Sequence, residues 1–169
     1  MAKLTALEIR QRLNLEPHPI EGGYFVQTYR AAHQLPSQAL PPGYSGARAV
    51  GTAIYYLLTP ETFSAMHRLP GDEIFHFYLG DPVEMLQLPP DGSGETIILG
   101  HDFARGMRPQ HVVPGGVWQG SGLIPGGEYA LLGTTMSPGF DYADYETGLR
   151  DQLITLYPQH SARIASLTR

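Results

Sequence analysis

Two short stretches of the sequence, residues 67–80 and residues 109–120, carry side chains that could do chemistry together. The first brings imidazole and carboxylate groups within ten positions, and the second places an indole and an amide shortly after a Pro-Gly-Gly turn. A histidine beside a carboxylate suits a divalent metal or a general acid–base pair, and an amide suits a polar substrate. The residues concerned are His67, Glu73, His76, Trp118 and Gln119.

The spacing within the first stretch predicts which of these groups can meet. His67 and Glu73 flank a Pro-Gly-Asp turn, so we expect them to lie on neighbouring strands and to face each other. Side chains alternate along a straight strand, which places Glu73 on one face with Phe75 and Phe77 and places His76 on the other face. His76 joins Glu73 only if a β-bulge intervenes. Otherwise we expect His76 to bond a partner on the opposite face or at a subunit interface.

Other roles for these residues need no active site. His67 beside a turn could be a hydrogen-bonded structural residue, and Trp118, the single tryptophan, could simply pack in the core. Gly22 and Gly23 are expected to serve the backbone geometry of a tight turn rather than phosphate binding, because no helix follows them. Ser64 lacks the flanking glycines of a nucleophile elbow, which argues against a serine hydrolase.

Composition narrows the class of protein. The 169 residues predict one domain, residues 1–169, with a sizeable core. A net charge of −5 without any Lys/Arg run argues against nucleic-acid and anionic-membrane partners. The chain has no cysteine, which excludes disulfides and thiolate chemistry. With no secretory h-region and no apolar stretch long enough to span a bilayer, we expect a cytoplasmic protein.

The pattern along the chain predicts an all-β protein with a short helix near each end. Residues 5–15 predict a helix with Thr5 as its cap and Glu8 completing a capping box, and residues 158–167 predict a second helix. A Pro- and Gly-rich loop over residues 33–48 suggests a lid or a partner contact. Between turns rich in Gly, Pro and Asp we expect strands over residues 23–29, 49–58, 63–69, 73–79, 83–88, 95–99, 110–113, 117–122 and 128–134. Such short, regularly spaced strands are typical of a sandwich or barrel, of which the jelly roll is one version.

Five motifs follow one another along nearly the whole chain, at His18–Arg30, Ala53–Leu58, His67–Pro82, Pro109–Gly120 and Pro138–Glu146. In this order they resemble the cupin superfamily, and within it a branch of small single-domain cupins, the fifth cupin group. The resemblance implies a double-stranded β-helix, that is, a jelly-roll barrel, and a homodimer. The strand over residues 22–30 is our candidate for an edge that pairs with a partner chain. Relatives by fold include sugar epimerases, seed-storage globulins, germin-like metalloenzymes and dioxygenases.

The resemblance also bears on metal binding. The general cupin pattern is His-x-His, then Glu, then Gly, followed in the second motif by Pro-x-Gly-x-x-His. His67 and Glu73 match the first His and the Glu, but Leu69 stands at the second His and Gln119 replaces the last. We therefore expect the protein to carry no stoichiometric transition metal, or to hold one only loosely. If a divalent metal is bound, the expected ligands are His67, Glu73, His76 and Gln119.

Three hypotheses follow. The first is a metal-free cupin that binds a small polar ligand, such as a sugar or nucleotide-sugar, and could act like an epimerase with His67 or Glu73 as the base. The second is a metal-dependent cupin enzyme of the dioxygenase or isomerase type, and the third is a non-catalytic ligand-binding or storage-like module. We expect a cavity lined by His67, Glu73 and Gln119, with His76 as a further contact if it turns inward. Its aromatic walls are expected from Tyr24, Tyr55, Phe75, Phe77 and Trp118.

Overall fold

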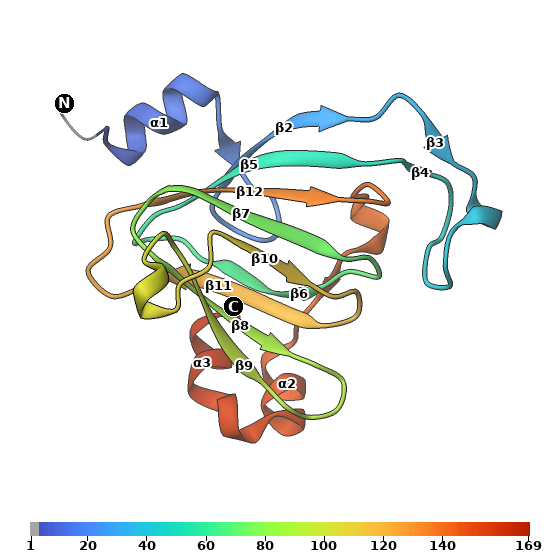
Figure 1. The fold of residues 1–169 in the computed structure, drawn as a ribbon. Coiled ribbons are helices and arrows are strands. Elements are labelled where there is room, and N and C mark those ends of the chain that lie inside the picture. Colours follow the sequence, from blue (N-terminus) through green and yellow to red (C-terminus); the bar gives the residue numbers. More distant parts are fainter. Residues whose placement is uncertain (1–3) are drawn as a thin grey trace.

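The computed structural model describes residues 4–169 and consists mainly of short strands joined by tight turns (Figure 1). The bounds predicted for three strands, at residues 83–88, 95–99 and 110–113, are those observed. In chain order the strands are β1 Glu16–Pro17, β2 Tyr24–Arg30, β3 Gln34–Leu35, β4 Arg48–Ala49, β5 Thr52–Leu58, β6 Ser64–Arg68, β7 Glu73–Gly80, β8 Val83–Leu88, β9 Glu95–Leu99, β10 Gln110–Val113, β11 Trp118–Leu123, β12 Ala130–Met136 and β13 Glu146–Thr147.

Antiparallel pairing assembles all of these strands except β3 and β4 into two facing sheets. The larger sheet has the order β1-β2-β5-β12-β7-β10 and the smaller has the order β13-β6-β11-β8-β9. Neighbours such as β5 and β12, or β6 and β11, come from distant parts of the chain. The two sheets enclose one interior (Figure 1), so the predicted jelly-roll barrel and the all-β fold class are confirmed.

The barrel interior has two halves, which the same strands pass through. Inward side chains follow the two-residue period of a strand. Along β12, Ala130 and Leu132 belong to a dense apolar core, whereas Thr134 and Met136 line a cavity. We call the two regions the packed half and the cavity half. The packed half consists of Tyr56, Leu58, Phe75, Phe77, Val83, Met85, Ile97, Leu99, Val113, Val117, Ala130 and Leu132.

The helices cover the outer faces of the sheets. Helix α1, Ala6–Leu13, has the predicted capping box between Thr5 and Glu8, and it packs beside β5 and β12 on the larger sheet (Figure 1). Helices α2, Arg150–Leu156, and α3, Ser161–Ser166, cover the smaller sheet. The sequence did not predict α2, because its N-cap, Leu149, offers no side-chain cap. Single 3-10 turns occur at η1 Ser37–Ala39, η2 Phe103–Arg105, η3 Tyr142–Asp144 and η4 Pro158–His160, the last replacing the start of the predicted C-terminal helix.

The loop predicted over residues 33–48 forms an arm that projects from the barrel (Figure 1). Its ends are joined by the short β3–β4 pair, and no residue of 33–47 lines the cavity. Strand β2 pairs with β5 on one side and with only the two residues of β1 on the other, so most of its outer edge is open. The homodimer stays a prediction. Within residues 4–169, no helix combines the length and apolar content needed to cross a membrane.

Candidate functional site

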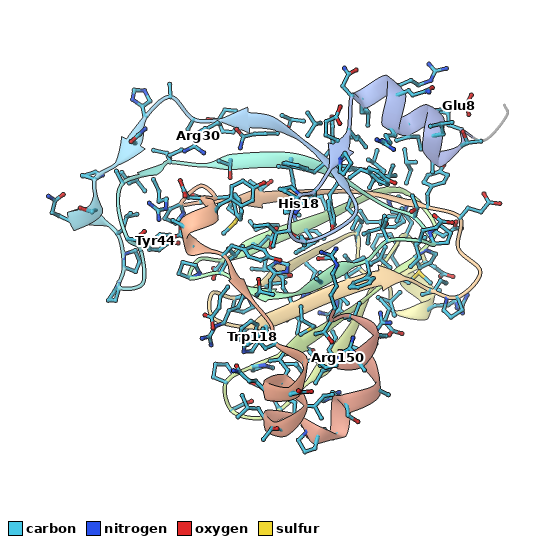
Figure 2. The ribbon with its side chains drawn as sticks, turned by 180° about the vertical axis from the view of Figure 1, so that it is seen from behind. Glu8, His18, Arg30, Tyr44, Trp118 and Arg150 are labelled. Atoms are coloured by element: carbon cyan, nitrogen blue, oxygen red, sulfur yellow. The ribbon has the colours of Figure 1, made fainter. Side chains whose placement is uncertain are left out.

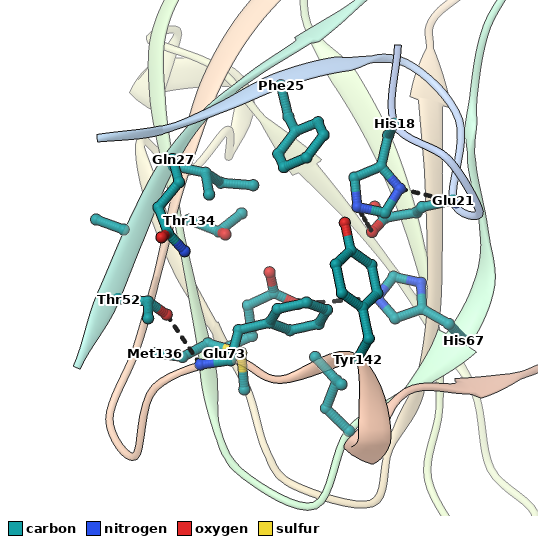
Figure 3. A pocket seen from close by; sticks show the side chains of 14 residues that line it. His18, Glu21, Phe25, Gln27, Thr52, His67, Glu73, Thr134, Met136 and Tyr142 are labelled. Carbon is teal, nitrogen blue, oxygen red and sulfur yellow. Dashed lines mark hydrogen bonds and ion pairs between the residues drawn. The ribbon is translucent and has the colours of Figure 1, made fainter. Parts of the chain in front are cut away.

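The cavity half of the barrel opens where β7 begins and β12 ends. It is narrow, about 70 Å³, within a hollow of about 540 Å³ that includes its mouth. Figure 3 shows polar and apolar side chains converging on it from both sheets and from two loops. The lining residues are His18, Glu21, Phe25, Gln27, Thr52, Ala53, Ile54, His67, Leu69, Glu73, Thr134, Met136, Phe140 and Tyr142.

His67 lies on β6 at the wall of the cavity and is only 1% exposed. Its Nδ1 is 2.7 Å from the carbonyl oxygen of Ala65, which can only accept, so Nδ1 carries a proton. Its Nε2 lies 3.8 Å from Glu73 Oε2. Burial lowers the pKa of His67, but the carboxylates of Glu21 and Glu73 and the Ala65 carbonyl more than offset this and raise it to about 9. His67 is therefore a buried cation at neutral pH.

Glu73 is the first residue of β7 and is 8% exposed. Its Oε2 accepts a 2.6 Å hydrogen bond from Gln119 Nε2, in addition to the approach of His67. Gln119 is the register partner of His67 in the β6–β11 pair, so the two side chains share the inward face. The predicted grouping of His67, Glu73 and Gln119 is thus present, although Gln119 lies behind Glu73 and does not itself line the cavity.

A loop between β1 and β2 supplies two site residues, His18 and Glu21, that the sequence analysis did not single out. The backbone N–H of Glu21 donates to His18 Nδ1 at 2.9 Å, so the proton of this neutral ring is on Nε2. Burial lowers the pKa of His18 despite the nearby Glu21 carboxylate. His18 Nε2 lies 4.0 Å from Glu21 Oε2, and both side chains face the cavity (Figure 3).

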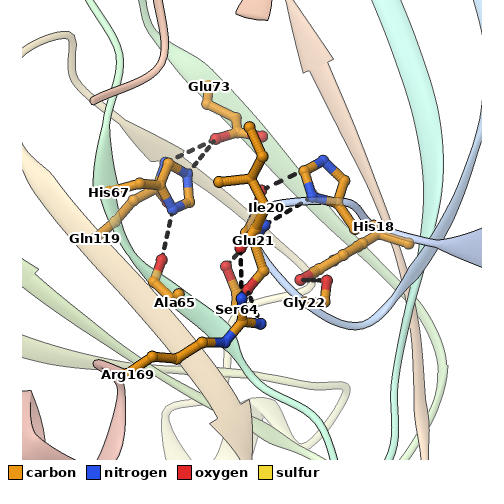
Figure 4. A network of polar contacts seen from close by, with 11 residues as sticks. His18, Ile20, Glu21, Gly22, Ser64, Ala65, His67, Glu73, Gln119 and Arg169 are labelled. Atoms are coloured by element: carbon orange, nitrogen blue, oxygen red, sulfur yellow. Dashed lines mark hydrogen bonds and ion pairs between the residues drawn. The ribbon is translucent and has the colours of Figure 1, made fainter. Parts of the chain in front are cut away.

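Hydrogen bonds from the side chains of Ser64 and Arg169 fix this loop in place (Figure 4). Ser64 Oγ donates to Glu21 Oε1 at 2.5 Å, and Arg169 Nη1 donates to the carbonyl oxygen of Ile20 at 2.7 Å. Gly22 has a φ of +104°, and a Cβ there would collide with the Phe63 carbonyl oxygen and the Arg169 guanidinium. The prediction that the two glycines serve backbone geometry is confirmed at Gly22. A histidine and a glutamate just before a Gly-Gly turn were the signal that could have revealed this part of the site.

A second loop, residues 138–148, closes the other side of the cavity. Tyr142 lines it, and the ring of Tyr145 stacks on His67 with centroids 4.9 Å apart. Burial and the Glu21 and Glu73 carboxylates raise the pKa of Tyr145, which keeps its proton. Arg48, at the base of the arm, holds this loop through two hydrogen bonds to Asp144, of 2.7 and 2.5 Å, and both side chains are 4% exposed.

The structure places the other predicted site residues elsewhere. His76 lies on the opposite face of β7 from Glu73, where its Nε2 is 3.1 Å from Thr135 Oγ1 and its ring stacks on Tyr78. The strand therefore keeps its regular alternation at this point, and no bulge turns His76 inward. His76 therefore bonds a partner on the opposite face, Thr135, which is the alternative expected without a bulge.

The expected aromatic walls also differ from those observed. Phe75 and Phe77 point into the packed half, and Tyr24 and Tyr55 lie on the outer face near α1. Trp118 packs beneath the C-terminal helices, as Figure 2 shows (Trp118 lies beside the helix of Arg150). A shift of one residue in strand register turns a side chain from one face of the sheet to the other. For β2, β5 and β11, the composition of the strand does not determine that register. The aromatic walls of the cavity come instead from Phe25, Phe140 and Tyr142.

The donor set of the cavity does not fit the transition metal that many cupins bind. Leu69, at the position of the second histidine, lines the cavity but has no lone pair to offer. Gln119 presents its amino group, a donor, to Glu73, and His76 is on the opposite face. Among residues 4–169, no group of three or more His, Cys, Asp and Glu side chains is arranged to hold a metal ion. That the purified protein carries no stoichiometric metal stays a prediction.

Comparison with known proteins agrees with this fold. A family model described as the cupin superfamily (DUF985) matches residues 8–148. The chain belongs to this cupin family. An uncharacterized protein of Saccharomyces cerevisiae is 34% identical over 158 residues, which cover 87% of this chain and 78% of the yeast protein. The structure is similar to those of a hypothetical protein from Leishmania major (TM-score 0.85, 35% identity, 98% and 99% of the two chains) and of a protein from Shewanella oneidensis (TM-score 0.86, 35% identity, 99% of each chain).

Proposed function

We propose that the protein binds a small polar, sugar-like ligand in the barrel cavity and moves a proton on it, as a metal-independent isomerase or epimerase does. The observation that carries this proposal is the position of Glu73. Its Oε2 is held by Gln119 and His67, while its Oε1, for which no hydrogen bond is found within residues 4–169, points into the cavity (Figure 3). A carboxylate held through one oxygen presents the other as a base with a fixed direction.

The reaction that this arrangement supports is proton transfer next to a carbonyl group. Glu73 removes a proton from the carbon beside the carbonyl, and the C–H electron pair moves to form an enolate whose charge is on the former carbonyl oxygen. Delivery of a proton to the opposite face of the carbon by a second donor, while Glu73 releases its proton to solvent, gives the epimer. Where that carbon carries a hydroxyl, the hydroxyl proton moves to the enolate oxygen and Glu73 returns its proton to the former carbonyl carbon, which gives the isomer. No atom or electron is gained or lost overall, so no oxidant or reductant is required.

The surroundings of Glu73 provide groups that stabilise the developing negative charge. His67 is a buried cation in the cavity wall, and its field acts in a site of low dielectric. His18 presents an Nε2–H group, and Tyr142 presents a hydroxyl whose pKa is raised by burial and by Glu21. We assign Glu73, rather than His67, as the base, because a protonated imidazole has no lone pair with which to take a proton.

Solvent deuterium exchange tests this proposal directly. The protein is incubated in D2O with a panel of aldoses and ketoses, and proton NMR follows deuterium incorporation at the carbon beside the carbonyl. Glu73→Gln should lower the exchange rate by about 100-fold or more while the ligand still binds. Glu61→Gln, which changes an exposed glutamate away from this cavity, is the matched control. Undiminished exchange in Glu73→Gln would overturn the assignment of the base. Binding of sugars without any exchange would overturn the enzymatic proposal and favour a ligand-binding module.

A further inference from the structure

We infer that the ligand enclosed by this cavity is an uncharged polyhydroxy compound, such as a free monosaccharide, and not a phosphorylated sugar or nucleotide-sugar. This inference rests on the proposed function, because both concern a ligand in the same cavity. The observation that supports it is that two carboxylates, Glu21 and Glu73, face one small cavity, and that no arginine or lysine of residues 4–169 lines this cavity.

The charges around the cavity leave a phosphate without a partner. Of the fourteen lining residues, Glu21 and Glu73 are acidic and His67 supplies the one positive charge. That imidazolium already faces Ala65 O through Nδ1 and Glu73 through Nε2. A phosphate entering this space would lose its water, meet two like charges and find no unengaged cation, whereas phosphate sites are usually built from Arg, Lys or several backbone N–H groups.

Most arginines of the chain are engaged elsewhere. Ten of its eleven Lys and Arg residues lie within residues 4–169, the exception being Lys3. Arg30 is exposed, and its Nη1 lies 3.4 Å from the carbonyl oxygen of Phe140, a lining residue. Six others are held by carboxylates, a hydroxyl or backbone carbonyls, namely Arg10, Arg48, Arg68, Arg150, Arg163 and Arg169.

The remaining lining groups suit hydroxyls and a sugar ring. Oxygen acceptors come from Glu21, Glu73 and the side chain of Gln27, and ligand hydroxyls can donate to all three. His18 Nε2–H and the Tyr142 hydroxyl provide donors in return. Phe25 and Phe140 offer apolar surface against which the C–H face of a ring can pack. An uncharged ligand with several hydroxyls therefore satisfies the cavity without burying an unpaired charge.

Binding measurements on matched ligand pairs test the inference. Isothermal titration calorimetry at fixed ionic strength compares free aldohexoses with the same hexoses as 1-phosphates and 6-phosphates, and with uridine diphosphate hexoses. We expect each phosphorylated form to bind at least about 10-fold more weakly than its free counterpart. Glu21→Gln and Glu73→Gln should each reduce this difference in affinity between the free and the phosphorylated sugar, because each removes a negative charge that repels the phosphate. In Glu21→Gln the new amide oxygen can still accept from Ser64, so the loop stays held. Glu61→Gln should leave the difference in affinity unchanged.

The outcomes separate this inference from the proposed function. Equal or tighter binding of the phosphorylated form would overturn the inference and leave proton transfer standing, and loss of that binding in Arg30→Ala would show where the phosphate lies. Selective binding of free hexoses without deuterium exchange would support the inference and overturn the catalytic proposal. Failure of every sugar to bind to folded protein, checked by circular dichroism, would overturn both.

Discussion

The packed half and the cavity half of the barrel interior are made by the same strands and yet have opposite character. Along β7, Phe77 and Phe75 belong to the packed half, and two residues earlier Glu73 begins the cavity half. Along β12 the change falls between Leu132 and Thr134. The alternating inward positions of a strand therefore carry both the stability and the chemistry of the fold, and one step of two residues separates them.

Two glutamines show the same contrast at closer range. Gln119 and Gln87 are register partners in the β8–β11 pair, and each is 2% exposed. Gln119 reaches across the barrel to the carboxylate of Glu73 at 2.6 Å, and the amide of Gln87 reaches His111 Nε2 at 2.5 Å. Burial and the Arg108 guanidinium lower the pKa of His111, so this second bridge joins neutral groups. The two glutamines thus connect the two sheets in different ways: Gln119 binds a charged carboxylate, and Gln87 binds a neutral imidazole.

The largest expected effect is on core packing. Leu132→Ala should lower the free energy of unfolding by about 3–4 kcal/mol, because the packed half cannot collapse around the missing atoms. Ile54→Ala removes a half-buried side chain that lines the cavity, where space is already present, and should cost about 2 kcal/mol, the low end of the range for such a truncation. Urea denaturation of both variants measures the difference. Equal losses would mean that the two halves are packed alike.

The next effect comes from pH. Because the folded pKa of His67 is raised to about 9, above its unfolded value of about 6.5, its contribution to stability is fully present below pH 6.5. That contribution, on the order of 3 kcal/mol, should be lost as pH rises through about 9. Urea denaturation between pH 6 and pH 10 should show this decline in the wild-type protein and in the exposed-site control His33→Gln. A decline of the same size in His67→Gln would assign it to other groups.

The smallest effect compares the two glutamine bridges. Gln119→Leu removes a hydrogen bond to a carboxylate and should cost about 2 kcal/mol, whereas Gln87→Leu removes a bond between neutral groups and should cost about 1 kcal/mol. Thermal unfolding of the two variants shows which substitution costs more stability, and circular dichroism spectra check that both variants are folded. A larger loss in Gln87→Leu would contradict the assignment of Gln119 as the bridge to the charged group.

The fold could be predicted from the sequence because turn residues and strand length are local signals. The bounds of β8, β9 and β10 follow from apolar runs between Gly-, Pro- and Asp-containing turns. The pair His67 and Glu73 could be predicted for the same reason, since one tight turn separates the two residues. The correct facing of Phe75 and His76 also followed from the period of a straight strand.

The rest of the site depends on contacts that no local pattern encodes. His18 and Glu21 reach the cavity because their loop is held by Ser64, 43 positions from Glu21, and by Arg169, 149 positions from Ile20. Tyr142 reaches it because Arg48 binds Asp144, 96 positions away. Residue type alone favours Tyr24, Tyr55 and Trp118 as cavity residues, but the register of their strands turns them toward the helices or the outer face.

The hydrogen bond between Arg169 and the Ile20 carbonyl has a consequence for folding kinetics. It closes a loop of almost the whole chain, and contacts of such long sequence separation form slowly, since the entropy of closing the loop is lost before the contact can stabilise the fold. The strands can pair while the wall that carries His18 and Glu21 is still open. We expect the backbone amides of that wall to gain protection from hydrogen exchange after those of the sheets. The binding site would then be the last part of the structure to form.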